Sequence, residues 1–125
     1  MTTAEISRDF TFEAAHSLPN VPNGHKCGRL HGHSYRLTVA VYGPLDPKLD
    51  WVVDFAEIDA VLEPVLAQLD HHCLNDIVGL HNPTSERIAH WIWDRIAGAW
   101  PGVTLDWLEI SETPKSRCRI TRVDE

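Results

Sequence analysis

The chain has 125 residues, of which 43% are hydrophobic and 23% charged, and its formal net charge is −7. This length predicts a single domain over residues 1–125, and the hydrophobic content argues against disorder. The negative charge argues against general nucleic-acid binding, and no apolar run approaches the ~18 residues of a membrane-spanning helix, so we expect neither nucleic acid nor membrane as a partner. Three widely spaced cysteines are typical of free thiols in a reducing compartment, so we expect a cytoplasmic protein.

The first predicted element is a strand over residues 8–16, whose apolar face also carries His16. Side chains alternate across a strand, so this face consists of Phe10, Phe12, Ala14 and His16. A long connection follows over residues 17–30, and it contains Cys27. A loop of that length in a small domain is more often functional than a simple connector.

The second predicted strand covers about residues 31–42 and ends at a Gly-Pro pair. His31 and His33 are two residues apart, so their imidazoles point to one face of this strand. Together with His16 they predict a Zn²⁺ site with three neutral imidazole ligands and one open position, which is typical of a catalytic site. Because Cys27 lies four residues before His31, a Cys-His-His zinc site remains an alternative.

Two helices are predicted after the second strand. Asp54 begins the first, because an aspartate followed three residues later by a glutamate is typical of a capping box, and an apolar stripe continues to Leu69. Pro64 interrupts this stripe and is expected to kink or break the helix. The second helix is predicted to begin with Thr84 or Ser85 as its N-cap.

The last part of the chain predicts two further strands. Residues 103–112 alternate as a strand, and a turn at 113–116 leads into a last strand through Val123. The order is therefore two strands, two helices and two strands. It predicts an α+β fold with a four-stranded antiparallel sheet and both helices on one face.

Several short motifs run in a fixed order along nearly the whole chain. They are Phe10-Thr11-Phe12-Glu13-Ala14-Ala15-His16, Cys27, His31-Gly32-His33-Ser34-Tyr35, Val53-Asp54-Phe55, Leu69-Asp70-His71-His72, Leu74-Asn75, Asn82-Pro83-Thr84-Ser85-Glu86 and Glu112-Thr113. This ordered set resembles the 6-pyruvoyl-tetrahydropterin synthase family. The three residues between Cys27 and His31 are similar to the compact spacing of its branch that forms 6-carboxy-5,6,7,8-tetrahydropterin, in the queuosine pathway.

The resemblance implies a tunnelling fold (T-fold), in which subunits join their sheets edge to edge into a barrel, and we expect a homohexamer made of two trimers. It also implies a zinc-dependent carbon–carbon lyase that acts on a small molecule, 7,8-dihydroneopterin triphosphate, and releases acetaldehyde and triphosphate. The matching positions are Cys27 as the catalytic base, Asp70 and His71 as a proton relay (with His72 less favoured), Glu112 as the anchor of the pterin ring, and Thr84 and Ser85 at the border of the pocket.

Elementary chemistry agrees with these roles. A thiolate forms nearer to neutral pH than an alkoxide, and a carboxylate can accept the paired N–H groups of the aminopyrimidinone edge of a pterin. Cys73 and Cys118 lack a comparable setting and are interpreted as packing thiols. Arginine and lysine hold phosphate where they converge. Two groups are candidates for this role: His25, Lys26 and Arg29 near Cys27, and Lys115, Arg117, Arg119 and Arg122 near the C-terminus.

Three alternatives remain open at this point. The pyruvoyl-forming reaction would keep all side-chain carbons of the substrate in one product. A non-catalytic zinc-binding module would tolerate the loss of Cys27 and His71. A zinc hydrolase would need a carboxylate base near the metal, and Glu13, the glutamate nearest to a ligand in sequence, points away from His16 by strand parity.

Overall fold

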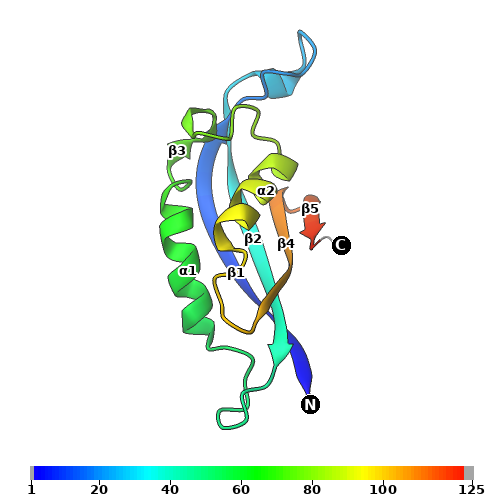
Figure 1. Ribbon diagram of the computed structural model, residues 1–125. Helices are drawn as coiled ribbons and strands as arrows, with labels where there is room; N and C mark the ends of the chain where they lie inside the picture. The colour runs from blue at the N-terminus through cyan, green and yellow to red at the C-terminus, as the bar shows by residue number, and fades with distance from the viewer. Residues whose placement is uncertain (1, 123–125) are drawn as a thin grey trace.

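The computed structural model describes residues 2–122, and in it one five-stranded sheet carries two α-helices on the same face (Figure 1). In chain order the elements are β1 (Thr3–His16), η1 (Lys26–Gly28), β2 (His31–Pro44), α1 (Phe55–Ala67), β3 (His72–Cys73), η2 (Leu74–Asp76), α2 (Ser85–Ile96), β4 (Thr104–Thr113) and β5 (Ser116–Thr121). The predicted α+β class is therefore confirmed. Neither α-helix in the described part of the chain is long and apolar enough to cross a membrane.

The predicted four-stranded antiparallel sheet is wrong in one respect, because a fifth strand is present. The strand order is β3-β1-β2-β4-β5, and β3 pairs in parallel with β1 at Ala14 and Ala15. His71 directs the chain onto β1: its φ is +59°, and its N–H donates to the carbonyl of Glu13 at 2.6 Å. A strand of two residues shows no alternation, so sequence periodicity could not reveal it.

β1 and β2 pair along their whole lengths, from Thr3 opposite Pro44 to His16 opposite His31. The predicted start of the first strand at residue 8 is wrong, because β1 begins at Thr3. Its first residues are largely exposed, so their apolar pattern is weak, and pairing with the end of β2 makes them a strand. β2 ends at Pro44, in the Gly-Pro pair that predicted its end.

A continuous apolar core fills the space between the sheet and the helices. β2 contributes every second residue to it, namely Tyr35, Leu37, Val39 and Val41, all 0% exposed. The helices contribute Ile58, Leu62 and Val65 from α1 and Ile88, Ala89, Trp91, Ile92 and Ile96 from α2. Burial of such side chains contributes about 1.5–3 kcal/mol each, so this layer fixes how the strands lie beneath the helices.

Both predicted helix starts are confirmed. The side chain of Asp54 accepts a hydrogen bond from the N–H of Ala56 at 3.0 Å, and α1 follows it directly. The hydroxyl of Thr84 accepts from the N–H of Arg87 at 3.2 Å, and α2 begins at the next residue. Each cap satisfies one of the N–H groups that a helix start leaves without a partner.

Of the kink or break predicted at Pro64, the break does not occur: α1 continues through the proline to Ala67. Leu62 and Val65 on either side of the proline are buried against the sheet, and this packing keeps the segment helical. Leu69 is also fully buried, although it lies beyond the end of the helix.

β4 and β5 form the predicted C-terminal hairpin, with Thr113 opposite Ser116 across the turn. The last strand was predicted to continue through Val123. It ends at Thr121, and Val123 lies outside the described residues.

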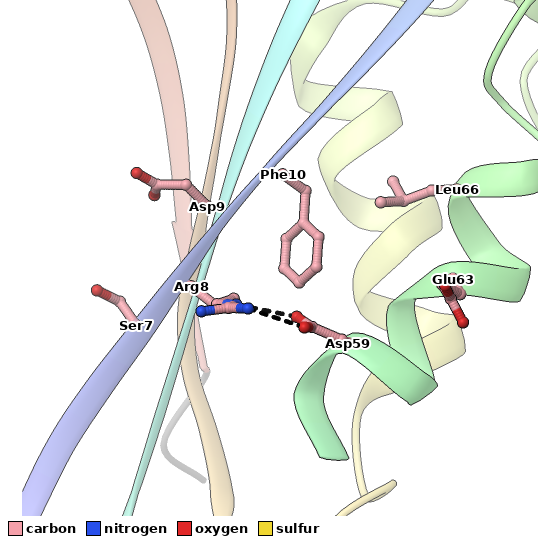
Figure 2. Close-up of a pocket in the computed structure, with 7 residues that line it drawn as sticks. All are labelled: Ser7, Arg8, Asp9, Phe10, Asp59, Glu63 and Leu66. Carbon is pink, nitrogen blue, oxygen red and sulfur yellow. Dashed lines mark hydrogen bonds and ion pairs between the residues drawn. The ribbon is translucent and has the colours of Figure 1, made fainter. Parts of the chain in front are cut away.

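The outer edge of β1 is open over most of its length. β3 covers it at Ala14 and Ala15, and among the described residues no other strand pairs there. Next to this edge a hollow of about 580 Å³ separates β1 from α1, and Arg8 crosses it to Asp59 through two hydrogen bonds of 3.0 and 2.9 Å (Figure 2).

Candidate metal centre and active site

Three histidines converge where β1 ends and β2 begins. The strand register places His16 opposite His31, and His33 follows two residues later on the same face of β2. Each of the three offers one ligand atom, and these atoms all lie within 4.8 Å of one another. The Nε2 atoms of His16 and His31 are 3.1 Å apart. This cluster can hold a metal ion.

Backbone carbonyls fix which nitrogen of two histidines faces the centre. Nδ1 of His16 donates to the carbonyl of Pro83 at 2.8 Å, and Nδ1 of His31 donates to the carbonyl of Arg29 at 2.7 Å. A carbonyl can only accept, so in a neutral ring Nε2 keeps its lone pair. Two lone pairs that face each other repel, and a cation between them removes that repulsion. Such outer contacts are how metal-binding histidines are usually oriented.

The third histidine has a nitrogen without a partner. Nε2 of His33 is buried, and it has no hydrogen-bond partner among the described residues. Burial lowers the pKa of His33 and also that of His16, which favours the neutral, metal-binding form of each ring. An unpaired buried nitrogen is costly, and coordination would satisfy it. The donor set therefore fits a divalent transition metal.

Tyr35 adds a buried hydroxyl to this cluster. Its oxygen lies 3.3 Å from Nδ1 of His16, and its ring stacks on Phe12 with the centroids 4.8 Å apart. Burial raises the pKa of Tyr35, so the hydroxyl stays protonated. In the sequence Tyr35 stood out only as part of the motif His31-Gly32-His33-Ser34-Tyr35.

Glu112 lies next to the histidines. One carboxylate oxygen, Oε1, accepts from the Ser85 hydroxyl at 2.9 Å, and the other, Oε2, lies 3.8 Å from Nε2 of His33. Of the two residues expected at the pocket border, Ser85 therefore contacts Glu112, whereas the Thr84 hydroxyl caps α2. Glu112 and His33 both line a pocket of about 800 Å³ that opens onto the helix-free face of the sheet.

Asp70 and His71 are in direct contact, with Oδ2 of Asp70 2.9 Å from Nδ1 of His71. The second oxygen of Asp70 accepts from the N–H of Glu13 at 2.9 Å. The bond from Glu13 and then the bond to His71 lower the pKa of Asp70. The His71 side chain is 78% exposed and lines a second pocket, of about 480 Å³, together with His33. His72 instead bonds to the carbonyl of Asp70 at 2.8 Å.

Cys27 lies in η1, within the long connection between β1 and β2. Its carbonyl accepts from the N–H of Leu18 at 2.8 Å, and its N–H donates to Nδ1 of His25 at 3.0 Å. Within residues 2–122, the clustered ligand atoms belong to three histidines, and Cys27 is not one of their group. The geometry therefore favours the histidine set over the Cys-His-His set.

The two groups of basic residues differ in their surroundings. Arg117 and Arg119 both pair with Glu109, at 3.2 and 2.8 Å, and Arg122 pairs with Asp106 at 3.1 Å. These carboxylates neutralise most of the C-terminal group. Lys26 and Arg29, in the loop that carries Cys27, have no ion pair within the described part of the chain.

Two side chains around the site received no functional role from the sequence. One is Tyr35, and the other is Asn75, whose amide bonds to the backbone of Ser17 next to His16. Both residues belong to the ordered motifs, and this was the one sign in the sequence that they matter. The contacts of Tyr35 with His16 and of Asn75 with Ser17 join residues that are far apart in the chain. Spacing alone could not reveal them.

Comparison with known proteins places this geometry among pterin enzymes. A family model described as 6-pyruvoyl tetrahydropterin synthase matches residues 5–123. A Synechocystis protein named 6-carboxy-5,6,7,8-tetrahydropterin synthase is 42% identical over 120 residues, which cover 91% of this chain and 90% of that protein. A Pyrococcus furiosus protein named dihydroneopterin monophosphate aldolase is 39% identical over 99 residues, or 79% of this chain and 80% of the relative. The structure of 6-pyruvoyl tetrahydropterin synthase from Caenorhabditis elegans superposes with a TM-score of 0.88 at 27% identity and covers 98% of each chain.

Proposed function

This chain belongs to the 6-pyruvoyl tetrahydropterin synthase family, and we propose that it is a zinc-dependent 6-carboxy-5,6,7,8-tetrahydropterin synthase. It would convert 7,8-dihydroneopterin triphosphate and water into 6-carboxytetrahydropterin, acetaldehyde and triphosphate, in the cytoplasm, as a step of queuosine biosynthesis. The observation that supports this most directly is the position of Glu112. Its carboxylate lies 3.8 Å from Nε2 of His33, so a small molecule bonded to Glu112 would lie beside the three imidazoles.

Glu112 is suited to hold the pterin ring. Ser85 occupies Oε1 by donating to it at 2.9 Å, which fixes the carboxylate plane and leaves Oε2 as an acceptor. The aminopyrimidinone edge presents N–H donors, and hydrogen bonds to an ionised acceptor are stronger than neutral ones. Ser85 would therefore border the substrate by orienting Glu112.

The reaction needs a proton removed from the substrate's side chain and a proton returned. Zn²⁺ held by His16, His31 and His33 would polarise the side-chain oxygens and make the adjacent C–H bond more acidic. Cys27, as a thiolate, would accept that proton. His71, oriented by Asp70 at 2.9 Å, would return a proton.

The triphosphate would be held by the loop that carries Cys27. Lys26 and Arg29 have no carboxylate partner within residues 2–122, whereas the C-terminal arginines are paired with Glu109 and Asp106. A cation free of a carboxylate is the better anion ligand.

We also propose that the chain assembles into a hexamer of two trimers. The sheet ends in β5 on one side and in the long β1 on the other, and β1 is covered only at Ala14 and Ala15 within the described residues. Long unpaired edges readily pair with another strand. Light scattering coupled to gel filtration should give a mass six times that of one chain, and a monomer would contradict this assembly.

The test of the activity joins a metal measurement to product identification. Purified protein should contain zinc and should release acetaldehyde from 7,8-dihydroneopterin triphosphate, detected by mass spectrometry. A product that retains all three side-chain carbons would instead identify the pyruvoyl-forming reaction. The monophosphate should be tested in parallel, because the Pyrococcus furiosus relative is named for it. Formation of dihydroneopterin would indicate a hydrolase, with Glu112 as its carboxylate.

Cys27→Ala separates catalysis from metal binding. We expect this variant to lose turnover and to keep its zinc, because the three imidazoles are unchanged. A wild-type chain that binds zinc and turns over none of these substrates would be a zinc-binding module.

A further inference from the structure

Asn75 holds the peptide that directly follows the metal-site residue His16. The N–H of Ser17 donates to Oδ1 of Asn75 at 2.9 Å, and Nδ2 of Asn75 donates to the carbonyl of Ser17 at 2.8 Å. These two bonds are of the kind that a neighbouring strand would make, and they occur just where β1 has ended. The side-chain amide of Asn75 therefore holds the backbone of Ser17, the first residue after β1, as a paired strand would hold it.

This peptide is also the base of the loop that carries the thiol. The next residue, Leu18, donates its N–H to the carbonyl of Cys27 at 2.8 Å. The path from Asn75 to Cys27 thus consists of two bonds to Ser17, one peptide link and one hydrogen bond. A shift of Ser17 would move Cys27 relative to His16.

Asn75 is itself well anchored. It lies in η2, directly after β3, which pairs with β1. Nδ2 also lies 3.4 Å from the carbonyl of His81, and Sγ of Cys73 lies 3.8 Å from Oδ1. The segment from Asp70 and His71 through β3 to Asn75 is therefore tied to the same end of β1 as the histidine cluster.

We propose that Asn75 is a positioning residue that sets the Cys27 thiol relative to the histidine cluster and to the Asp70–His71 pair. This rests on the proposed function in assigning the thiol a catalytic task. The amide suits the position because it supplies a donor and an acceptor at once. Alanine would leave both backbone atoms of Ser17 without this partner, and aspartate would set a carboxylate oxygen against the carbonyl of Ser17.

The experiment compares Asn75→Ala and Asn75→Asp with Asn20→Ala. Asn20 lies in the same loop, is exposed, and makes no side-chain hydrogen bond within residues 2–122, so it is the matched control. We expect kcat to fall about 10–100-fold in both Asn75 variants, as for loss of other outer supports of a site. KM should stay within about twofold, because the groups that hold the pterin are untouched. Zinc content should be unchanged, since all three imidazoles remain.

Two readouts do not depend on turnover. The Leu18 amide should lose hydrogen-exchange protection, and alkylation of Cys27 by iodoacetamide, mapped by mass spectrometry, should become faster in both Asn75 variants but not in Asn20→Ala. Wild-type kcat with a protected Leu18 amide would overturn the proposal, as would a fall in kcat that follows loss of zinc. If Asn75→Ala does not fold, Asn75→Asp gives the same readouts. If the wild-type chain turns over no pterin, the proposed function fails, and exchange and alkylation still decide the role of Asn75.

Discussion

The two faces of the sheet differ in the contacts that stabilise them and in the side chains that they present. On the helix-covered face, alternate residues of β2 run from Val39 and Leu37 in the core through Tyr35 to His33. The histidine cluster that can hold a metal ion therefore lies at the end of the apolar core. His33 continues the row of fully buried side chains Val39, Leu37 and Tyr35, which hold this part of β2 in place. A site of fixed geometry needs such rigid support.

On the open face, the same strands carry polar contacts that water can reach. Ser34 donates to Glu13 and Thr38 donates to Asp9, both at 2.7 Å. Such bonds exchange readily with water and contribute little to stability. Because successive residues of β2 point to opposite faces, neighbouring substitutions can test each face separately.

The largest difference is expected between Leu37→Ala and Thr38→Ala. Leu37 is 0% exposed, and its truncation should lower the free energy of unfolding by about 2–5 kcal/mol, because it removes apolar contacts and leaves a cavity. Thr38→Ala removes one exposed hydrogen bond and should cost less than about 1 kcal/mol. Urea unfolding of both variants measures this. Equal losses would mean that the two faces contribute alike.

The same comparison at the metal centre uses His33→Ala and Ser34→Ala. Loss of one of three ligands should weaken zinc binding by more than about 100-fold, beyond the 10–100-fold typical of losing an outer support. Ser34→Ala should leave the affinity unchanged, since its hydroxyl bonds to Glu13 on the other face. Competition with a chromogenic chelator gives both affinities. Weaker binding in Ser34→Ala would show that the open face supports the metal.

Much of this organisation could be predicted because it follows from local pattern. Strand alternation placed His31 and His33 on one face of their strand and His16 on the apolar face of its own, and the cap residues Asp54 and Thr84 marked both helix starts. These signals depend on residues a few positions apart. They hold here because β2 presents an unbroken row of buried side chains to the helices, from Tyr35 to Val41.

The rest depends on contacts between distant segments. β3 exists because His71 turns the chain onto β1, and α1 continues through Pro64 because its neighbours are buried. The carbonyl of Pro83 reaches His16 from the loop before α2, and Asn75 reaches Ser17 from η2. Sequence spacing contains no signal for such pairs. The three imidazoles were therefore predictable as a group, whereas the groups that orient them were not.

A smaller effect is expected from Tyr35→Phe, which removes only the hydroxyl near His16. The stack on Phe12 remains, so the core should be kept, while His16 loses a polar neighbour at 3.3 Å. Zinc affinity should fall about 10-fold, the low end for an outer support. Tyr42→Phe is the matched control, because Tyr42 is an exposed residue of β2 whose hydroxyl donates to Thr3 of β1. Equal affinity in Tyr35→Phe and the wild type would show that the carbonyl of Pro83 alone orients His16.

The smallest effects are expected from the arginines on the open face. Arg117 and Arg119 share the carboxylate of Glu109, but Arg119 also lies over the Trp107 ring, 3.7 Å from its centroid. Arg119→Ala should therefore cost more stability than Arg117→Ala, yet at most about 1 kcal/mol, since exposed ion pairs gain little over hydration. The Glu109 contribution should shrink at high salt, whereas the ring contact should persist because it also buries the arginine stem. Urea unfolding at low and high salt separates the two contributions. A cost that matches Leu37→Ala would mean that the open face supports the fold as strongly as the covered one.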